Sequence, residues 1–293
     1  MSREQQTEQR INFTKMHGCG NDYIYIDCFE QKIDCPERLA VGLSKRHFSI
    51  GSDGLVLICR SDVADAKMRM FNADGSEGKM CGNAIRCVGK YLHDKKGLDK
   101  NPLTIETQSG IKTLTLFTEN GKVTKARVNM GKAELNPSKI PVDINADKAV
   151  DYKIQLHGKD YYITCVSMGN PHCVIFGDDP DKLDLCAIGP EFENYPLFPQ
   201  RINTEFIQVL DRKTLKMRVW ERGSGETLAC GTGACAAAVA AVENNICLRN
   251  DDINVMLKGG QLTVRYTDDG TVYMTGGADF AFEGTVDISE FTQ

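Results

Sequence analysis

The sequence lacks several features that would place it in a specialised class of protein. Its 293 residues are 41% hydrophobic and 26% charged, and the formal net charge is -5. Basic residues are thus in slight deficit, which argues against nucleic acid as a partner, because phosphate binding needs a basic face. The longest apolar run, residues 234–242, is too short to span a bilayer, so we expect no membrane association.

Export and metal-binding signals are also missing. Residues 1–11 are polar and lack the apolar core of a secretory signal, so we expect only a polar leader there. Twelve cysteines are present but none form a C-x-x-C pair, and we predict no metal site. A chain of this length needs no disulfide scaffold, and reduced cysteines in the cytoplasm fit best.

The chain repeats itself at a constant spacing of 149 residues. Residues 66–83 align without gaps with residues 215–232, and six positions of the first segment meet identical residues: Lys67, Met68, Arg69, Glu77, Cys81 and Gly82. The same shift places Gly20-Asn21 on Gly169-Asn170. One shift that aligns separate segments indicates two homologous halves, each of ordinary domain size.

Alternating and apolar runs predict many strands in both halves. Between them we predict hairpins at residues 156–160 and 267–271, and helices at residues 36–46, 83–96, 180–188 and 232–245. The last helix is almost wholly apolar, which is typical of a helix buried on all sides. The sequence therefore predicts an α/β (α+β) fold of two pseudo-symmetric domains, each a mixed β-sheet wrapped around a central helix.

A cysteine followed by glycine precedes the central helix in each half, at Cys81 and Cys230. The free N–H groups and the dipole of a helix favour negative charge at this end, and they can lower a cysteine pKa from ~8.5 to roughly 3.5–7.5. Gly82 and Gly231 would let a carboxylate approach the backbone. A single such cysteine is usually only a small buried residue, but the aligned pair favours a functional role.

Two such cysteines suit one particular reaction. If the halves pack about a pseudo-twofold axis, Cys81 and Cys230 would face one cleft, which we expect to be the active site. A thiolate on one side removes an α-proton, and a thiol on the other delivers a proton to the opposite face of the carbon. This inversion needs no pyridoxal cofactor, so we expect none, and N–H donors at the helix ends would stabilise the developing charge.

Five segments resemble the diaminopimelate epimerase family, and they occur in the family's order: MHGCGNDYIYID, FNADGSEGKMCGNAIRC, MGNPH, RINTEF and ERGSGETLACGTGACA. The resemblance implies cofactor-free interconversion of LL- and meso-2,6-diaminoheptanedioate, in lysine and peptidoglycan-precursor biosynthesis. It also implies a cytoplasmic isomerase, a homodimer, and two domains closing over the substrate. These would be residues 12–130 with about 279–293, and residues 131–278.

The resemblance also implies roles for individual residues. Cys81 and Cys230 match the catalytic acid and base, and His172 and Glu221 match residues that support catalysis. The positions that match substrate-binding residues are Asn21, Asn72, Gly82, Asn83, Asn170, Asn203, Glu221, Arg222, Gly231 and Thr232. One departure is Gly54, where some members carry glutamine, so any side-chain contact from that position is lost.

The chemistry of these residues is compatible with the implied substrate. Only one of its two amino acid ends is inverted, so the repeat should be asymmetric where the other end is bound. Indeed Asn72-Ala73 in one half aligns with Glu221-Arg222 in the other, an acid and a base suited to an ammonium and a carboxylate. Plainer readings are open: each asparagine as a turn or cap residue, Glu221-Arg222 as an exposed pair, and His172 as a hydrogen-bonded histidine.

Three other functions compete with this interpretation. One is a sister activity on proline or hydroxyproline. A second is a cysteine hydrolase or thiol peroxidase, which needs one attacking cysteine and gives no reason for a symmetric duplication. The third is a non-catalytic amino acid binding protein, which would tolerate the loss of Cys81.

Overall fold

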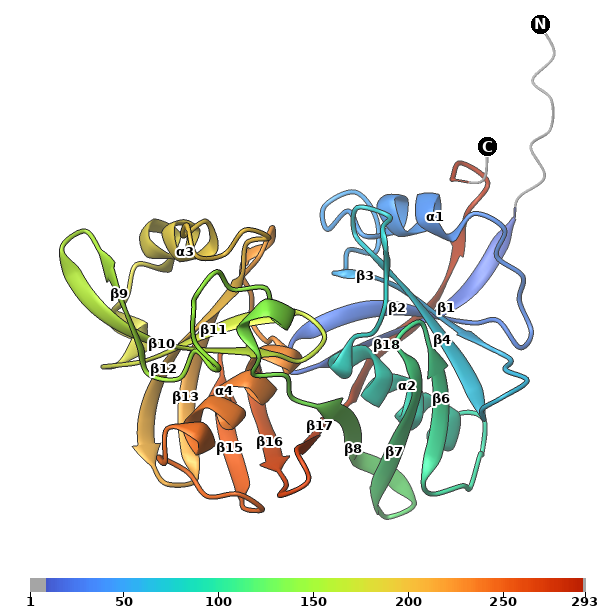
Figure 1. The fold of residues 1–293 in the computed structure, drawn as a ribbon. Coiled ribbons are helices and arrows are strands. Elements are labelled where there is room, and N and C mark those ends of the chain that lie inside the picture. Colours follow the sequence, from blue (N-terminus) through green and yellow to red (C-terminus); the bar gives the residue numbers. More distant parts are fainter. Residues whose placement is uncertain (1–8, 292–293) are drawn as a thin grey trace, which may run out of the picture. The chain divides into compact units, whose positions relative to one another are not determined.

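A computed structural model describes residues 9–291, which form two compact units (Figure 1). Within the described residues, unit 1 consists of residues 9–128 and 277–291, and unit 2 of residues 129–276. Residues 1–8 of the expected polar leader lie outside the described residues, whereas Arg10 and Ile11 already belong to the first strand. Among the described residues, no helix has both the length and the apolarity needed to cross a bilayer.

Unit 1 is a mixed sheet in which neighbouring strands follow the order β18-β1-β2-β3-β4-β6-β7-β8, with the short β5 beside β4. The β2–β3 and β4–β6 pairs are parallel, and the other pairs are antiparallel. The strands are β1 (Arg10–Gly18), β2 (Asn21–Asp27), β3 (Gly54–Cys59), β4 (Ala66–Asn72), β5 (Glu77–Gly78), β6 (Leu103–Thr107), β7 (Gly110–Glu119), β8 (Lys122–Lys132) and β18 (Asp279–Asp287). Its helices are α1 (Pro36–Leu43) and α2 (Gly82–Asp94).

Unit 2 repeats this plan with neighbours in the order β9-β10-β11-β12-β13-β15-β16-β17 and the short β14 beside β13. Here the parallel pairs are β11–β12 and β13–β15. The strands are β9 (Tyr152–Leu156), β10 (Lys159–Ser167), β11 (Pro171–Phe176), β12 (Asn203–Asp211), β13 (Thr214–Glu221), β14 (Gly225–Glu226), β15 (Asp252–Leu257), β16 (Gly260–Tyr266) and β17 (Thr271–Gly277). Its helices are α3 (Leu185–Glu193) and α4 (Gly231–Glu243).

The 149-residue spacing seen in the sequence recurs in the structure, which confirms the predicted duplication. Helices α1 and α2 start 149 residues before α3 and α4. The strand register obeys the same spacing, because Tyr23 pairs with Gly54 in unit 1 as His172 pairs with Asn203 in unit 2. The units differ at one edge, where β9 forms a hairpin with β10 but the distant β18 pairs with β1.

The central helix of unit 2 is buried on all sides, as its composition predicted. Eleven of the residues of α4 are buried, and the helix packs against β10–β13, β15 and β16. In unit 1, α2 packs against β1, β2 and β7 and buries Arg86 among its apolar residues. Burying each helix within its own sheet fixes the position of its N-terminus, and thus of the cysteine there.

Most local predictions agree with the structure, and one is wrong. Both predicted hairpins are present, and His157-Gly158 closes the first with positive φ angles of 51° and 75°. The predicted helix at residues 180–188 is instead a 3₁₀ turn at Pro180–Lys182 followed by α3. The break occurs because the Asp184 side chain caps α3 by accepting the Ala187 N–H at 3.2 Å.

Candidate active-site residues

Cys81 is the N-cap residue of α2 in unit 1. Its backbone is extended, and its sulfur accepts the Ala84 N–H at 3.5 Å. Gly82 is the first helical residue and is buried, so the start of α2 is held in place by the residues around it. The thiol therefore lies against the free N–H groups of the helix, where a thiolate would be stabilised.

Asn21 and Asn83 form a hydrogen-bonded group at the Cys81 thiol. The Cys81 thiol donates to Asn21 Oδ1 at 3.5 Å, and Asn83 Nδ2 donates to the same oxygen at 3.2 Å. Asn21 Nδ2 in turn donates to Asp53 Oδ2 at 2.7 Å, which fixes the orientation of the amide. The structure thus brings these two predicted asparagines into direct contact with Cys81 or its neighbours.

Two residues that the sequence analysis missed also act on Cys81. Burial raises the pKa of Cys81 above its ordinary value, and hydrogen bonds from the Ala84 and Asn83 backbone lower it. The buried Arg86 guanidinium and a hydrogen bond from Tyr23 lower this pKa further. Burial also holds the pKa of the Tyr23 phenol well above its ordinary value, so Tyr23 stays a neutral donor.

Cys230 occupies the equivalent position in unit 2. It is the N-cap residue of α4, its backbone is extended, and its sulfur accepts the Gly233 N–H at 3.4 Å. Thr232 Oγ1 lies 3.6 Å from the sulfur. Since Gly233 follows Ala84 by 149 residues, both thiols accept the same backbone N–H of their helices.

A buried polar cluster lies beside Cys230. His172 and Glu205 are both 0% exposed, and His172 Nδ1 lies 2.7 Å from Glu205 Oε1. His172 Nε2 lies 3.1 Å from Asn170 Oδ1, so both ring nitrogens have partners. Glu205 Oε2 is buried without a hydrogen-bond partner, which leaves part of its charge uncompensated. The cluster therefore places negative charge close to the second thiol.

Glu221 adds a second carboxyl group near Cys230. It accepts a hydrogen bond from Thr227 Oγ1 at 2.5 Å, and burial raises its pKa above the ordinary value. Burial raises the pKa of Cys230 well above its ordinary value, and the charges of Glu221 and Glu205 raise it further. The charged groups around the two thiols therefore have opposite sign: Cys81 lies near a guanidinium, and Cys230 lies near two carboxyl groups.

Asn203 and Arg222 form a separate contact at the start of β12. Asn203 Nδ2 donates to the Pro171 carbonyl at 2.8 Å, and its Oδ1 accepts the Arg222 N–H at 2.9 Å. The Arg222 guanidinium donates to the Gln200 carbonyl at 2.8 Å. In the described part of the chain, Glu221 bonds Thr227 rather than pairing with Arg222, so the two are not the simple exposed ion pair considered from the sequence.

Asn72 stands apart from the other predicted residues. It is exposed, and its Nδ2 donates to Ser76 Oγ at 2.9 Å. No hydrogen bond among residues 9–291 joins it to Cys81. Asn72 is the counterpart of Glu221 at the 149-residue spacing. Because it carries an amide instead of a carboxyl group, Cys81 has no equivalent of the Glu221 carboxyl group that lies near Cys230.

Glu205 and Arg86 could have been suspected from the sequence. Glu205 is a single acid in the apolar strand NTEFIQV, and Arg86 a single base in the apolar helix segment NAIRCVG. A charge in a buried run is uncommon unless it has a partner. Tyr23 gave no such signal, since a tyrosine is ordinary in a strand.

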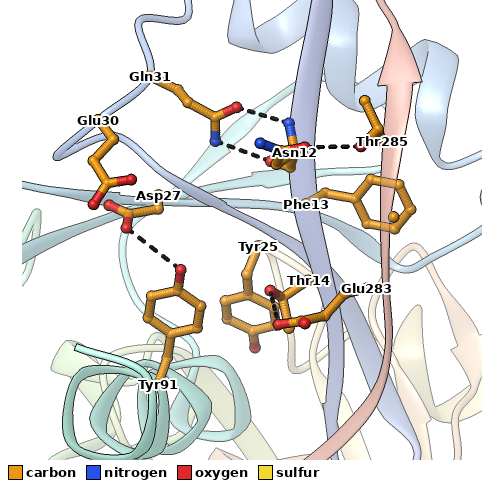
Figure 2. A pocket seen from close by; sticks show the side chains of 11 residues that line it. Asn12, Phe13, Thr14, Tyr25, Asp27, Glu30, Gln31, Tyr91, Glu283 and Thr285 are labelled. Carbon is orange, nitrogen blue, oxygen red and sulfur yellow. Dashed lines mark hydrogen bonds between the residues drawn. The ribbon is translucent and has the colours of Figure 1, made fainter. Parts of the chain in front are cut away.

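A cavity of about 450 Å³ opens in unit 1, and none of the predicted site residues lines it (Figure 2). Its acidic side chains already have partners: Tyr91 donates to Asp27 at 3.4 Å, and Lys96 pairs with Asp27 at 2.9 Å. Gln31 bonds both backbone groups of Asn12. We therefore place no functional residue in this cavity. Among the described residues, no group of three or more His, Cys, Asp or Glu side chains is arranged to hold a metal ion.

Solved structures with this fold include epimerases and related enzymes. A phenazine biosynthesis protein of the PhzF family from Bacillus anthracis matches with a TM-score of 0.71 and 18% identity, covering 95% of this chain and 99% of its own. A hydroxyproline epimerase from Agrobacterium vitis matches with a TM-score of 0.69 and 13% identity, covering 97% and 93%. At these identities the likeness establishes the fold, one shared by epimerases.

Sequence comparison is more specific. The family profile described as diaminopimelate epimerase matches residues 13–136 and 164–281. The diaminopimelate epimerase of Acetivibrio thermocellus is 54% identical over 96% of this chain and 100% of its own length. That of Methanococcus maripaludis is 53% identical over 95% and 100%. The chain therefore belongs to the diaminopimelate epimerase family and is an isomerase.

Proposed function

We propose that this protein interconverts LL- and meso-2,6-diaminoheptanedioate by proton transfer between Cys81, the substrate α-carbon and Cys230. The observation that carries the proposal is the repeated thiol geometry. Each cysteine caps a buried helix and accepts the N–H of the third residue after it. Family membership, with relatives of that name at 54% and 53% identity, supports the choice of substrate.

The reaction needs one thiolate and one thiol at the start of each turnover. In one direction Cys81 removes the α-proton, and Cys230 delivers its own proton to the other face of the carbon. In the reverse direction the roles are exchanged. The proton lost from substrate remains on the first sulfur, so the enzyme ends each turnover in the complementary protonation state.

The helix N-termini provide the electrostatic stabilisation that this chemistry requires. Removal of the α-proton places negative charge on the adjoining carboxylate, and fixed N–H donors stabilise such charge without reorganisation. We assign this contact to Gly82-Asn83 and Gly231-Thr232. These residues begin α2 and α4, and Gly82 and Gly231 have no side chain to obstruct the approach.

The remaining predicted residues would recognise the substrate and adjust the thiols. We assign the substrate's amino acid groups to Asn21, Asn72, Asn170, Asn203 and Arg222. His172 and Glu221 lie in the polar cluster at Cys230, where the charge of Glu221 influences whether that sulfur holds a proton. Glu221 can serve both purposes, because its carboxyl group can also accept from a substrate ammonium.

Proton NMR in D2O tests the proposal directly. Reduced protein is mixed with LL-2,6-diaminoheptanedioate without added pyridoxal phosphate. We expect the α-proton signal to disappear as the meso isomer forms, because solvent deuterium replaces the proton held on sulfur. No exchange and no meso product from folded, reduced protein would refute the substrate assignment, and proline and hydroxyproline would then be tested.

Single variants test the two-cysteine mechanism separately. Cys81→Ala and Cys230→Ala should each abolish inversion, since no second group replaces either proton carrier. A binding protein would lose little on Cys81→Ala, and a one-cysteine hydrolase would need just one of the two. If either variant keeps more than about a hundredth of the activity, the paired mechanism is wrong, because removing a general acid or base costs roughly 10²–10⁴-fold.

The pathway, location and assembly are also proposals. The implied place in lysine and peptidoglycan-precursor synthesis follows from the substrate. Location in the cytoplasm remains a prediction from the reduced cysteines, and the homodimer a prediction from the family resemblance. Light scattering on the purified protein tests the last point, since a dimer has twice the 32.4 kDa mass of the chain.

A further inference from the structure

Cys28 and Cys59 lie next to each other in unit 1, at the ends of two adjacent parallel strands. In the β2–β3 register the last pair is Asp27 with Ile58, so the next step along both strands pairs Cys28 with Cys59. The ladder continues to this point, because the Cys28 N–H donates to the Ile58 carbonyl at 2.9 Å. Neighbouring strands lie ~4.7–4.9 Å apart, within the ~4.4–6.8 Å between Cα atoms that a disulfide spans.

The two thiols also interact with each other. A hydrogen bond between the thiols raises the pKa of Cys28 and lowers that of Cys59, as expected when Cys28 donates to the Cys59 sulfur. Both side chains pack against the core of unit 1 yet remain partly exposed. The pair is therefore in contact and accessible to a small solute.

The charges around the pair make the two cysteines unequal. Apart from the hydrogen bond, burial raises the pKa of Cys59, whereas the positive charges of Arg69 and Lys67 lower it and Asp27 opposes them. The net result is a Cys59 pKa below the ordinary value of a thiol. Lys67 is the register partner of Cys59 in the β3–β4 pair, and because the thiolate is the reactive form, we assign Cys59 as the nucleophile and Cys28 as the second thiol.

We propose that Cys28 and Cys59 form a reversible disulfide when the protein meets hydrogen peroxide. The Cys59 thiolate attacks one peroxide oxygen and breaks the O–O bond, giving a sulfenic acid and, after protonation, water. The Cys28 sulfur then attacks the Cys59 sulfur and expels hydroxide, which takes the Cys28 proton and leaves as a second water. Two thiols lose two electrons in total, one peroxide is reduced, and a dithiol reverses the reaction by exchange.

Unit 2 contains a second cysteine pair that serves as a natural control. Cys165 and Cys173 are directly opposite in the antiparallel β10–β11 register, and both are 0% exposed. Burial raises the pKa of Cys173 well above its ordinary value. This pair has the proximity but not the access, so we expect it to remain reduced.

The site is separate from the catalytic proposal. Asn21, which contacts Cys81, begins β2, whereas Cys28 follows its other end, so the two are about 20 Å apart at ~3.3 Å per residue. The positions 149 residues after Cys28 and Cys59 are Gly177 and Gln208, so the pair is absent from the repeated plan. Its oxidation therefore belongs to unit 1 alone.

Peptide mass mapping tests the proposal on the full chain. Reduced protein is exposed to a few equivalents of hydrogen peroxide, quenched, alkylated in denaturant and digested. We expect a Cys28–Cys59 cross-linked peptide that has lost two hydrogens and disappears with dithiothreitol, while Cys165 and Cys173 are recovered alkylated. Recovery of Cys28 and Cys59 as separate alkylated peptides, under conditions that oxidise other cysteines, would overturn the proposal.

Variants separate this pair from the catalytic cysteines and assign the attacking sulfur. The cross-link should form equally in Cys81→Ser/Cys230→Ser, so its detection does not depend on the proposed activity. In Cys28→Ser, dimedone should label a sulfenic acid at Cys59, because the thiol paired with it has been removed. In Cys59→Ser, Cys28 should remain unlabelled. Labelling of Cys28 there, or none of Cys59 in Cys28→Ser, contradicts the assigned roles.

Discussion

At the scale of single residues, the two catalytic candidates differ in their electrostatic surroundings. Cys81 has a guanidinium and a phenol nearby, whereas Cys230 has two carboxyl groups. We predict that iodoacetamide alkylates Cys81 faster than Cys230 in the free enzyme, because only the thiolate reacts. Both rates should rise with pH, and Cys230 should need the higher pH because its pKa is raised more strongly. Time-resolved peptide mapping measures both rates in one sample.

Glu221→Gln is the matched control for this comparison. It keeps the size of the side chain and removes its negative charge, so it should accelerate alkylation of Cys230 and leave that of Cys81 unchanged. Equal rates at the two cysteines in the wild type would show that the neighbouring charges do not govern reactivity. A change at Cys81 would point to a wider disturbance of the fold.

Gly233 leads to a further prediction about a single residue, based on the space around it. A Cβ atom there would lie 2.6 Å from Glu205 Oε1 and 3.2 Å from the Cys230 sulfur. Gly233→Ala should therefore displace the thiol, reduce activity roughly 10- to 100-fold and cost about 1–3 kcal/mol of stability. The equivalent residue in unit 1 is already Ala84, so an Ala84→Gly variant should lose about 1 kcal/mol by helix propensity. Its activity should fall far less, and similar losses in both variants would contradict the steric argument.

At the scale of elements, strand β18 distinguishes the two units. It pairs with β1 along eight positions, and Ile288 just beyond it is 1% exposed in the core of unit 1. Ending the chain at Ala278 should destabilise unit 1 by several kcal/mol, since losing one buried isoleucine already costs about 2–5 kcal/mol. Hydrogen exchange should accelerate in β1 and β2.

The single tryptophan offers an internal control for that truncation. Trp220 lies in unit 2, and its indole N–H donates to Glu193 Oε2 at 2.7 Å. Its fluorescence should therefore remain native in the truncated chain. Unchanged exchange in β1 would show that β18 contributes little, and a shifted tryptophan spectrum would show that the damage reaches unit 2.

Most elements could be predicted from the sequence because their signals are local. The buried helix α4 follows from its alanines, and the hairpin at His157-Gly158 from its turn residues. The break before α3 was missed because it depends on Asp184, a capping signal weaker than the apolar pattern around it. The cysteines at the helix starts were found because two copies of the pattern reinforced each other.

At the scale of the whole molecule, the limits of sequence reasoning follow from the duplication itself. The repeat identifies what the two units share, and Cys81 and Cys230 are part of that shared plan. It cannot identify what one unit adds alone, such as Glu205 with its buried His172 partner, whose counterpart positions hold Val56 and Tyr23. Asymmetric residues of this kind are visible only once the fold brings distant side chains together.

The duplication also predicts how the two cysteines cooperate between copies of the chain. One chain supplies both thiols in our proposal, so a mixture of Cys81→Ala and Cys230→Ala proteins should remain inactive even after exchange of subunits in a homodimer. If instead each site combined Cys81 of one subunit with Cys230 of the other, half of the randomly mixed dimers would carry one intact site, restoring roughly a quarter of wild-type activity. Co-refolding the two variants in equal amounts and following the meso isomer by NMR distinguishes the two outcomes. A regain of that size would overturn the assignment of both thiols to one chain while leaving the two-cysteine chemistry intact.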